Sequence, residues 1–145
     1  MSEEIKNKLE ICNVEKKFKK NEVLKKLNCT LESGVYAILA PNGVGKTTLM
    51  RCIADIYSYH GEIKFNGKNI KKQKVKIGYL PQQFGLFPEL TVYQMMEYFC
   101  NLKKISKKER KAAIEICLKK VNLYDKKDEK NRKLSGGMIR RVGIA

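Results

Sequence analysis

Residues 40–47, Ala-Pro-Asn-Gly-Val-Gly-Lys-Thr, have the types and spacing needed to bind a phosphate chain. They fit the phosphate-loop pattern G-x-x-x-x-G-K-[ST] at every fixed position except the first, which is Ala40. We expect negative φ at Ala40, where alanine is tolerated. The pattern predicts that the N–H groups of residues 43–47 surround a β-phosphate, Lys46 reaches the β- and γ-phosphates, and Thr47 ligates Mg²⁺. The predicted nucleotide-binding residues here are Ala40, Pro41, Asn42, Gly43, Val44, Gly45, Lys46, Thr47 and Thr48.

The segments around this loop support nucleotide binding. Residues 35–39 form an apolar run rich in strand formers, which predicts a fully buried strand. After the loop, apolar Leu49, Met50 and Ile53 follow at helical spacing and predict a helix that lies on the sheet. Strand, loop and helix occur in the order that a phosphate loop requires, which favours this function over a simple glycine-rich turn.

A second motif is Leu134-Ser135-Gly136-Gly137-Met138. A Ser-Gly-Gly step that opens a helix leaves unpaired N–H groups at a positive helix end, and glycines let a phosphate approach the backbone. By itself such a step is more often an ordinary loop and helix cap. The upstream phosphate loop makes an anion-binding role the better interpretation.

Together, the two motifs resemble the nucleotide-binding domain of ABC ATPases, from about Leu9 to Ala145. The resemblance implies an α/β fold: a P-loop NTPase core with an N-terminal antiparallel β layer and an inserted helical subdomain. It also implies ATP and Mg²⁺ as cofactors, and a transmembrane permease subunit and a second nucleotide-binding domain, in a head-to-tail dimer, as partners. The location implied is cytoplasmic, at the inner face of the membrane through that permease.

The resemblance also assigns roles to single residues. Phe18 is at the position of an aromatic residue that stacks on adenine. Gln82 is at the position of a glutamine that senses Mg²⁺ and the attacking water, although the neighbouring Gln83 is an alternative register. Residues 134–138 would contact the ATP bound by the other subunit's phosphate loop. Met138 replaces the glutamine usual at the end of this signature, so a side-chain hydrogen bond is lost there.

The chain of 145 residues is short for this family's cassette, and we expect a C-terminally truncated, incomplete fold. The family's strand with the catalytic Asp and Glu, and its switch histidine, are not found. His60 is the only histidine, and we interpret it as a loop residue. The sequence therefore offers no catalytic carboxylate, and the 145 residues alone are expected to be inactive as an ATPase and poorly folded.

The net charge of +16 raises the question of a nucleic-acid partner. However, the 31 basic residues are mostly lysines scattered in pairs, without arginine clusters or runs of aromatic residues. A solvated basic surface is the better interpretation, and no nucleic-acid partner is expected.

Local patterns predict the remaining elements. Alternation over residues 9–14 and 27–31 predicts strands of an antiparallel layer, and Asn66-Gly67 predicts a hairpin between strands at residues 61–65 and 68–70. A further strand at residues 76–80 would deliver Gln82 to the nucleotide. Capping-box patterns at Thr91 and Ser106 start two helices. The inward residues predicted for the second helix are Ala113, Ile116, Cys117, Leu118 and Val121.

We expect the chain to have three parts: the β layer and phosphate-loop core at 1–83, a helical subdomain at 84–134, and the start of the signature helix at 135–145. The predicted function is the ATP-binding subunit of an ABC transporter. Residues 79–92 look most like exporters of drugs or antibiotic peptides. The alternative is a soluble ABC ATPase that acts on ribosomes or DNA. A generic GTPase or small-molecule kinase would leave the signature unexplained.

Overall fold

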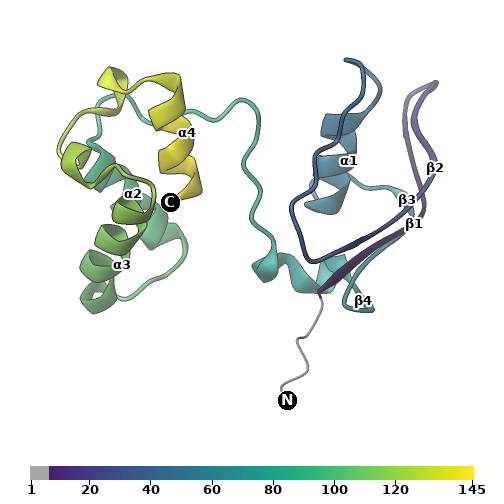
Figure 1. The fold of residues 1–145 in the computed structure, drawn as a ribbon, viewed down its shortest axis with the longest axis horizontal. Coiled ribbons are helices and arrows are strands. Elements are labelled where there is room, and N and C mark those ends of the chain that lie inside the picture. The colour runs from purple at the N-terminus through teal and green to yellow at the C-terminus, as the bar shows by residue number, and fades with distance from the viewer. Residues whose placement is uncertain (1–6) are drawn as a thin grey trace. The chain divides into compact units, whose positions relative to one another are not determined.

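The computed structural model describes residues 7–145, and the side chains of all of these except 74–76 (Figure 1). The chain divides into two compact units, the first ending at Tyr79 and the second beginning at Leu80. The boundaries between the three parts expected from the sequence, at 83/84 and 134/135, remain predictions. Residues 1–6 of the first part lie outside the described residues.

The first unit contains a four-stranded antiparallel sheet in the order β2-β1-β3-β4. Its strands are β1 (Lys8–Phe18), β2 (Asn21–Glu32), β3 (His60–Phe65) and β4 (Lys68–Asn69). The predicted antiparallel layer is therefore confirmed. The hairpin is confirmed too, because Asn66 and Gly67 both have positive φ, 50° and 72°, as a tight two-residue turn between twisted strands requires.

The predicted helix after the phosphate loop is α1 (Lys46–Ile53). It packs on the sheet through the buried Cys52, and a 3-10 helix, η1 (Ile70–Lys76), packs there through Ile70. The apolar alternation of β1 and β2 places one face of each strand in this core. The buried side chains of the cluster are Ile11, Val14, Leu24, Cys52, Ile63 and Ile70.

Two predicted strands are wrong. Residues 35–39 form no strand, and Val35 and Leu39 are exposed at 103% and 91%. The apolar run has the composition of a buried strand, but a strand forms only against a partner, and no strand among residues 7–145 pairs with it. The segment at 76–80 has no strand either: residue 76 ends η1, and residues 77–80 are irregular for the same reason.

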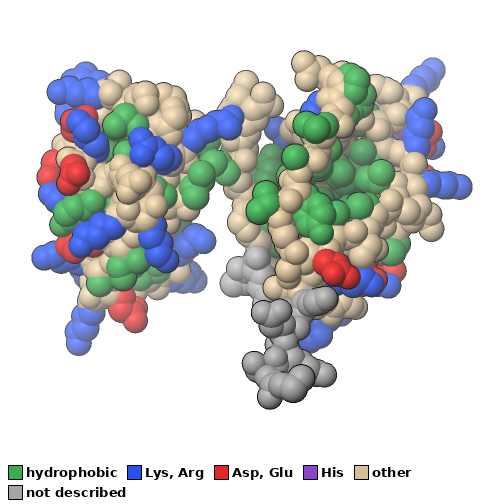
Figure 2. Space-filling view, viewed as in Figure 1, with side chains coloured by type: hydrophobic (Ala, Val, Ile, Leu, Met, Phe, Trp, Pro, Cys, Tyr) green, Lys and Arg blue, Asp and Glu red, His purple; other side chains and the backbone are tan. Residues whose placement is uncertain are grey.

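The second unit is helical. It consists of α2 (Val92–Leu102), α3 (Lys107–Lys120) and α4 (Gly136–Ile144), with short 3-10 turns η2 (Tyr124–Lys126) and η3 (Asn131–Lys133). All three helices contribute to one core, and Figure 2 shows Lys and Arg side chains spread over the outside of this unit. The buried residues of that core are Val92, Met96, Cys100, Ile114, Leu118, Leu123, Leu134 and Val142.

The two predicted capping boxes differ in outcome. At Thr91 the box is complete, since the hydroxyl accepts from the Gln94 N–H at 3.2 Å and the Gln94 side chain accepts from the Thr91 N–H at 2.9 Å. At Ser106 the predicted helix start is confirmed, since Ser106 is the N-cap of α3, but the box is wrong, because the hydroxyl donates to the Glu109 carboxylate at 2.6 Å instead of capping the backbone. On α3 the inward position of Leu118 is confirmed.

The other inward positions predicted on α3 are less buried. Ile116 is 54% exposed, so its predicted burial is wrong, and Ile114 is buried in its place. Because the helix turns 100° per residue, Ile116 lies about 200° from Ile114, on the side opposite the buried stripe that contains Ile114 and Leu118. Ala113, Cys117 and Val121 are intermediate in exposure.

Candidate functional site

The phosphate loop lies between residue 40 and α1, and its glycines have the backbone conformations that the pattern predicts. Gly43 and Gly45 have φ of +85° and +108°, in the region that side chains disfavour. A Cβ on Gly45 would also lie 2.8 Å from Val23 Cγ1, so glycine is required there for packing on β2 as well. Ala40 is not among the residues with positive φ, which confirms the expectation that alanine is tolerated there.

The N-terminus of α1 presents unpaired N–H groups. Gly45 is the N-cap residue and has no side chain to cap the helix, and the first helical bond runs from the Leu49 N–H to the Gly45 carbonyl at 2.8 Å. The N–H groups of residues 46–48 therefore have no acceptor within the helix. No acidic residue is present in the first turn, so the positive end of the helix dipole is not compensated. This end of α1 suits an anion.

Lys46 lies over the loop that precedes it. Its Nζ donates to the carbonyl oxygens of Ala40, at 2.5 Å, and Pro41, at 2.7 Å. An ammonium that binds neutral carbonyls can exchange them for phosphate oxygens, since bonds between charged partners are stronger. Thr47 is exposed, so its hydroxyl is accessible to a ligand. These residues fit a polyphosphate with its Mg²⁺.

Phe18 ends β1 and is paired with Asn21 of β2. Its ring contacts Tyr57 edge to face, with centroids 5.4 Å apart, and the Lys16 Nζ lies 5.0 Å from its centroid. Arg51 of α1 donates to the Tyr57 hydroxyl at 2.6 Å. Hydrogen bonding to the hydroxyls of Tyr79 and Tyr57 raises the pKa of the Arg51 guanidinium.

The sheet register connects Phe18 to the phosphate loop. The Gly45 backbone packs against Val23 and Leu24 of β2. Phe18 is paired with Asn21, two residues before Val23, and two residues of a strand span about 7 Å. The structure thus brings Phe18 and the phosphate loop together within the first unit.

The second unit contains the signature motif at the start of α4. Ser135 is the N-cap, and its hydroxyl accepts from the Met138 N–H at 3.3 Å. Gly136 and Gly137 are exposed, and a Cβ on either would meet no atom within 4 Å. Leu134 is buried, and Met138 packs partly against the helical core. This helix end is open to approach, as the motif predicts for an anion-binding tip.

Sequence reasoning missed the residue that anchors this motif, Asn131. Its side chain is 2% exposed, and its Nδ2 donates to the Phe87 carbonyl at 2.9 Å. Its backbone N–H donates to the Leu90 carbonyl, also at 2.9 Å. Glu89 accepts from both Lys130 and Arg132, which lowers its carboxyl pKa through the hydrogen bond from Lys130 and the charge of Arg132. An asparagine in a polar stretch follows no periodicity, so no pattern identifies it.

Gln82 belongs to the second unit, where it is exposed in an irregular segment. Its carbonyl accepts a long hydrogen bond, 3.5 Å, from Arg140 of α4. Gly143, also on α4, packs against Leu80 and Phe84, where a Cβ would lie 2.6 Å from Leu80 Cδ1. The segment that contains Gln82 is therefore attached to the signature helix, while Lys46 and Thr47 belong to the first unit.

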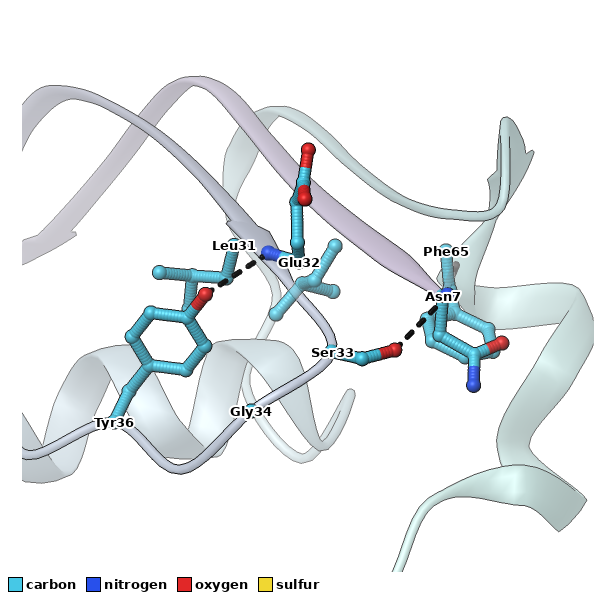
Figure 3. Close-up of a pocket in the computed structure, with 8 residues that line it drawn as sticks. Asn7, Leu31, Glu32, Ser33, Gly34, Tyr36 and Phe65 are labelled. Atoms are coloured by element: carbon cyan, nitrogen blue, oxygen red, sulfur yellow. Dashed lines mark hydrogen bonds between the residues drawn. The ribbon is translucent and has the colours of Figure 1, made fainter. Parts of the chain in front are cut away.

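A cavity of about 420 Å³ lies elsewhere in the first unit (Figure 3). Tyr36 borders it and accepts from the Glu32 N–H at 3.2 Å, and the Ser33 hydroxyl accepts from the Asn7 N–H at 3.1 Å. Its lining residues include no Lys, Arg or His, so it does not suit a polyphosphate. The lining residues are Asn7, Leu9, Leu31, Glu32, Ser33, Gly34, Tyr36 and Phe65.

Among residues 7–145, no group of three or more His, Cys, Asp or Glu side chains could hold a metal ion. None of the helices described here is long and apolar enough to span a membrane.

Comparison with known proteins identifies the family. A family model described as ABC transporter matches residues 24–145. The L-cystine import ATP-binding protein TcyC of Bacillus subtilis is 40% identical over 152 residues, covering 94% of this chain and 61% of TcyC. The Fe(3+) ions import ATP-binding protein FbpC of Fusobacterium nucleatum is 36% identical over 142 residues, covering 94% of this chain and 38% of FbpC.

Solved structures agree. An ABC transporter ATP-binding protein of Pyrococcus furiosus matches with a TM-score of 0.71 and 32% identity, over 93% of this chain and 66% of that protein. CbiO1 of Clostridium perfringens, described as part of the ABC transporter complex cbiONQ, matches with a TM-score of 0.82 and 28% identity, over 94% of this chain and 59% of that protein. The predicted fold class is confirmed.

The chain spans 38% to 61% of the length of these two curated relatives. Both are named for import, as is the spermidine/putrescine import ATP-binding protein PotA of Hahella chejuensis, which is 34% identical over 142 residues, covering 94% of this chain and 39% of PotA. The prediction of a drug or antibiotic-peptide exporter is not supported. The family match and the relatives show that this chain belongs to the ABC transporter family.

Proposed function

We propose that this chain is the ATP-binding part of an ABC transporter subunit, and that its phosphate loop binds the phosphates of ATP. The observation that carries this proposal is the position of Lys46 over the loop, 2.5 Å from the Ala40 carbonyl, beside the uncapped N–H groups of α1. A flexible cation and a positive helix end at one place are a site for a polyphosphate. Phe18 would then bind the base of the same nucleotide, because β2 connects it to the loop.

In this proposal the Thr47 hydroxyl ligates the Mg²⁺ that accompanies ATP, and Gln82 completes its environment in the assembled protein. Mg²⁺ would neutralise charge between the β- and γ-phosphates. The exposed Thr47 side chain supports the first role. The parts at 1–83, 84–134 and 135–145 then correspond to core, helical subdomain and signature helix.

The signature motif binds a second nucleotide in the same proposal. Residues 134–138 would contact an ATP on another copy of the domain, in a head-to-tail dimer, with Ser135, Gly136 and Gly137 facing its phosphates. The open approach to Gly136 and Gly137 supports this role.

The names of the relatives favour transport, and import in particular. Their cargoes differ, from Fe(3+) ions to L-cystine and spermidine, so this part of the protein does not indicate a cargo. A membrane permease partner, and through it a location at the membrane, follow from the proposal. The ribosome or DNA alternative has no support among these names.

Competition binding tests the polyphosphate site. ATP labelled with a fluorescent group on its ribose should bind the full-length protein and be displaced by inorganic tripolyphosphate. Adenosine should displace it only at much higher concentration, since it lacks the phosphates that the loop binds. Displacement by adenosine and not by tripolyphosphate would contradict the proposal.

A further inference from the structure

Two aromatic rings and two cations form a cluster at the end of β1: Phe18, Tyr57, Lys16 and Arg51. Phe18 and Tyr57 meet edge to face, with centroids 5.4 Å apart and ring planes at 77°. Tyr57 follows α1 by four residues and precedes β3 by three. An edge-to-face contact favours one relative orientation of the two rings. The orientation of Phe18 therefore depends on that of Tyr57.

Tyr57 is itself fixed from α1. Arg51 donates to the Tyr57 hydroxyl at 2.6 Å, and its guanidinium carbon lies 5.3 Å from the Tyr57 centroid. The Tyr57 N–H also donates to the Arg51 carbonyl at 3.2 Å. Because α1 begins at the phosphate loop, these contacts tie the Tyr57 ring to the helix that starts with Lys46.

Lys16 joins the two rings from the strand. Its Nζ lies 5.0 Å from the Phe18 centroid and 5.6 Å from the Tyr57 centroid, and it donates to the Ser58 hydroxyl at 3.4 Å. A cation over two ring faces favours their present arrangement. Lys16 is paired with Leu24, the residue against which Gly45 packs, so this contact is also next to the phosphate loop.

The cluster leaves part of Phe18 free. The residue is 40% exposed, although Tyr57 and Lys16 both contact its ring. A ring that is fixed by its neighbours and still partly open is suited to stacking on a planar base, since little motion is lost when the base binds.

We propose that Tyr57 is a positioning residue, which holds the Phe18 ring in the orientation that stacks on the base of the bound nucleotide. This inference rests on the proposed function, because it requires the phosphates of that nucleotide on the Lys46 loop. Its consequence is specific: Tyr57 contributes to the base-dependent part of the affinity and not to the phosphate-dependent part.

The test compares two probes, ATP and inorganic tripolyphosphate, on the full-length protein by equilibrium titration. Tyr57→Leu should weaken ATP binding about fivefold and leave tripolyphosphate binding unchanged. Tyr57→Phe keeps the ring that contacts Phe18 but loses the hydrogen bond from Arg51, so its ATP affinity should lie between those of wild type and Tyr57→Leu. Phe18→Leu should weaken the binding of ATP and not that of tripolyphosphate. The double variant Phe18→Leu/Tyr57→Leu should bind ATP as tightly as Phe18→Leu alone, because the two residues act through the same contact.

The matched control is Tyr124→Leu. Tyr124 also has two lysines over its ring, Lys119 and Lys127, at 5.0 and 5.9 Å, but it belongs to the helical unit. This variant should change neither affinity. Unchanged tripolyphosphate binding by Tyr57→Leu also shows that its phosphate loop is folded.

Four outcomes would overturn the inference. Equal losses for both probes in Tyr57→Leu would show a structural role only, and no loss for either would show no role. If Tyr57→Leu weakened ATP binding and Phe18→Leu did not, the base would not stack on Phe18. If the wild-type protein bound neither probe, the proposed function would fail first, and the role of Tyr57 with it.

Discussion

The Nζ of Lys46 lies 2.5 Å from the carbonyl oxygen of Ala40, so the two ends of the phosphate loop are hydrogen-bonded to each other. A second bond to the Pro41 carbonyl, at 2.7 Å, strengthens this closure. The Lys46 ammonium, which would bind a polyphosphate, is therefore already held against the loop, next to the positive end of α1.

The loop depends on glycine at position 45 more than at position 43. Gly45→Ala would combine strain at φ +108° with a clash against Val23, and we expect it to lower the free energy of unfolding by about 2–4 kcal/mol. Gly43→Ala is the control, since a Cβ there meets no atom within 4 Å, and strain alone should cost about 1–2 kcal/mol. Urea unfolding measures both, and equal losses would contradict the packing role of Gly45.

Asn131 should stabilise the segment that leads to the signature motif. Asn131→Ala removes a buried side chain that donates to the Phe87 carbonyl at 2.9 Å, and we expect a loss of about 1–3 kcal/mol in stability. Faster hydrogen exchange of the residue 131 and 132 amides should accompany it. The exposed Asn101 on α2 provides the control, because Asn101→Ala should change neither quantity.

The Glu89 carboxyl should titrate below the ordinary range for glutamate, because the Lys130 hydrogen bond and the Arg132 charge lower its pKa. A lowered pKa in the folded state means that the stabilisation is complete above the unfolded-state pKa and is lost as the pH falls through the folded-state pKa. NMR titration of Glu89 in wild type and in Lys130→Gln/Arg132→Gln checks this. An unchanged midpoint in the double variant, at low salt, would contradict the assignment.

The exposed apolar residues of the first unit predict self-association of the 145-residue chain. Figure 2 shows hydrophobic side chains gathered on one face of this unit, and Val35 and Leu39 are almost fully exposed. Large exposed apolar surface promotes association. Leu39→Lys should reduce light scattering in solution, whereas Leu102→Lys, at a 63% exposed position of the second unit, should reduce it less. Equal effects would contradict a specific role of residues 35–39.

Features that depend on near neighbours could be predicted from the sequence. The Thr91 cap and the turn at Asn66 and Gly67 are determined within four residues, and both were predicted correctly. The strands at 9–14 and 27–31 were also predicted, because their alternating apolar residues face a core within the same unit.

Features that depend on distant partners could not. Residues 35–39 have the composition of a buried strand, yet strand formation requires a partner that composition does not specify. A local feature also fails where a side chain has two acceptable partners nearby: the Ser106 hydroxyl donates to the Glu109 carboxylate, three residues away, instead of accepting from a backbone N–H. The pairing of Phe18 with Tyr57 arises from the sheet register near residue 60, so the role of Tyr57 has no sequence pattern.

ATP binding by Lys46 variants tests the central proposal most directly. Isothermal titration of the full-length protein with MgATP should give a dissociation constant for Lys46→Ala at least about tenfold weaker than for wild type, since a charge-assisted hydrogen bond to phosphate is lost. Lys108→Ala, which removes an exposed lysine of α3, should bind as wild type does. Equal dissociation constants for Lys46→Ala and wild type would contradict the assignment of residues 40–48 as the ATP-binding loop.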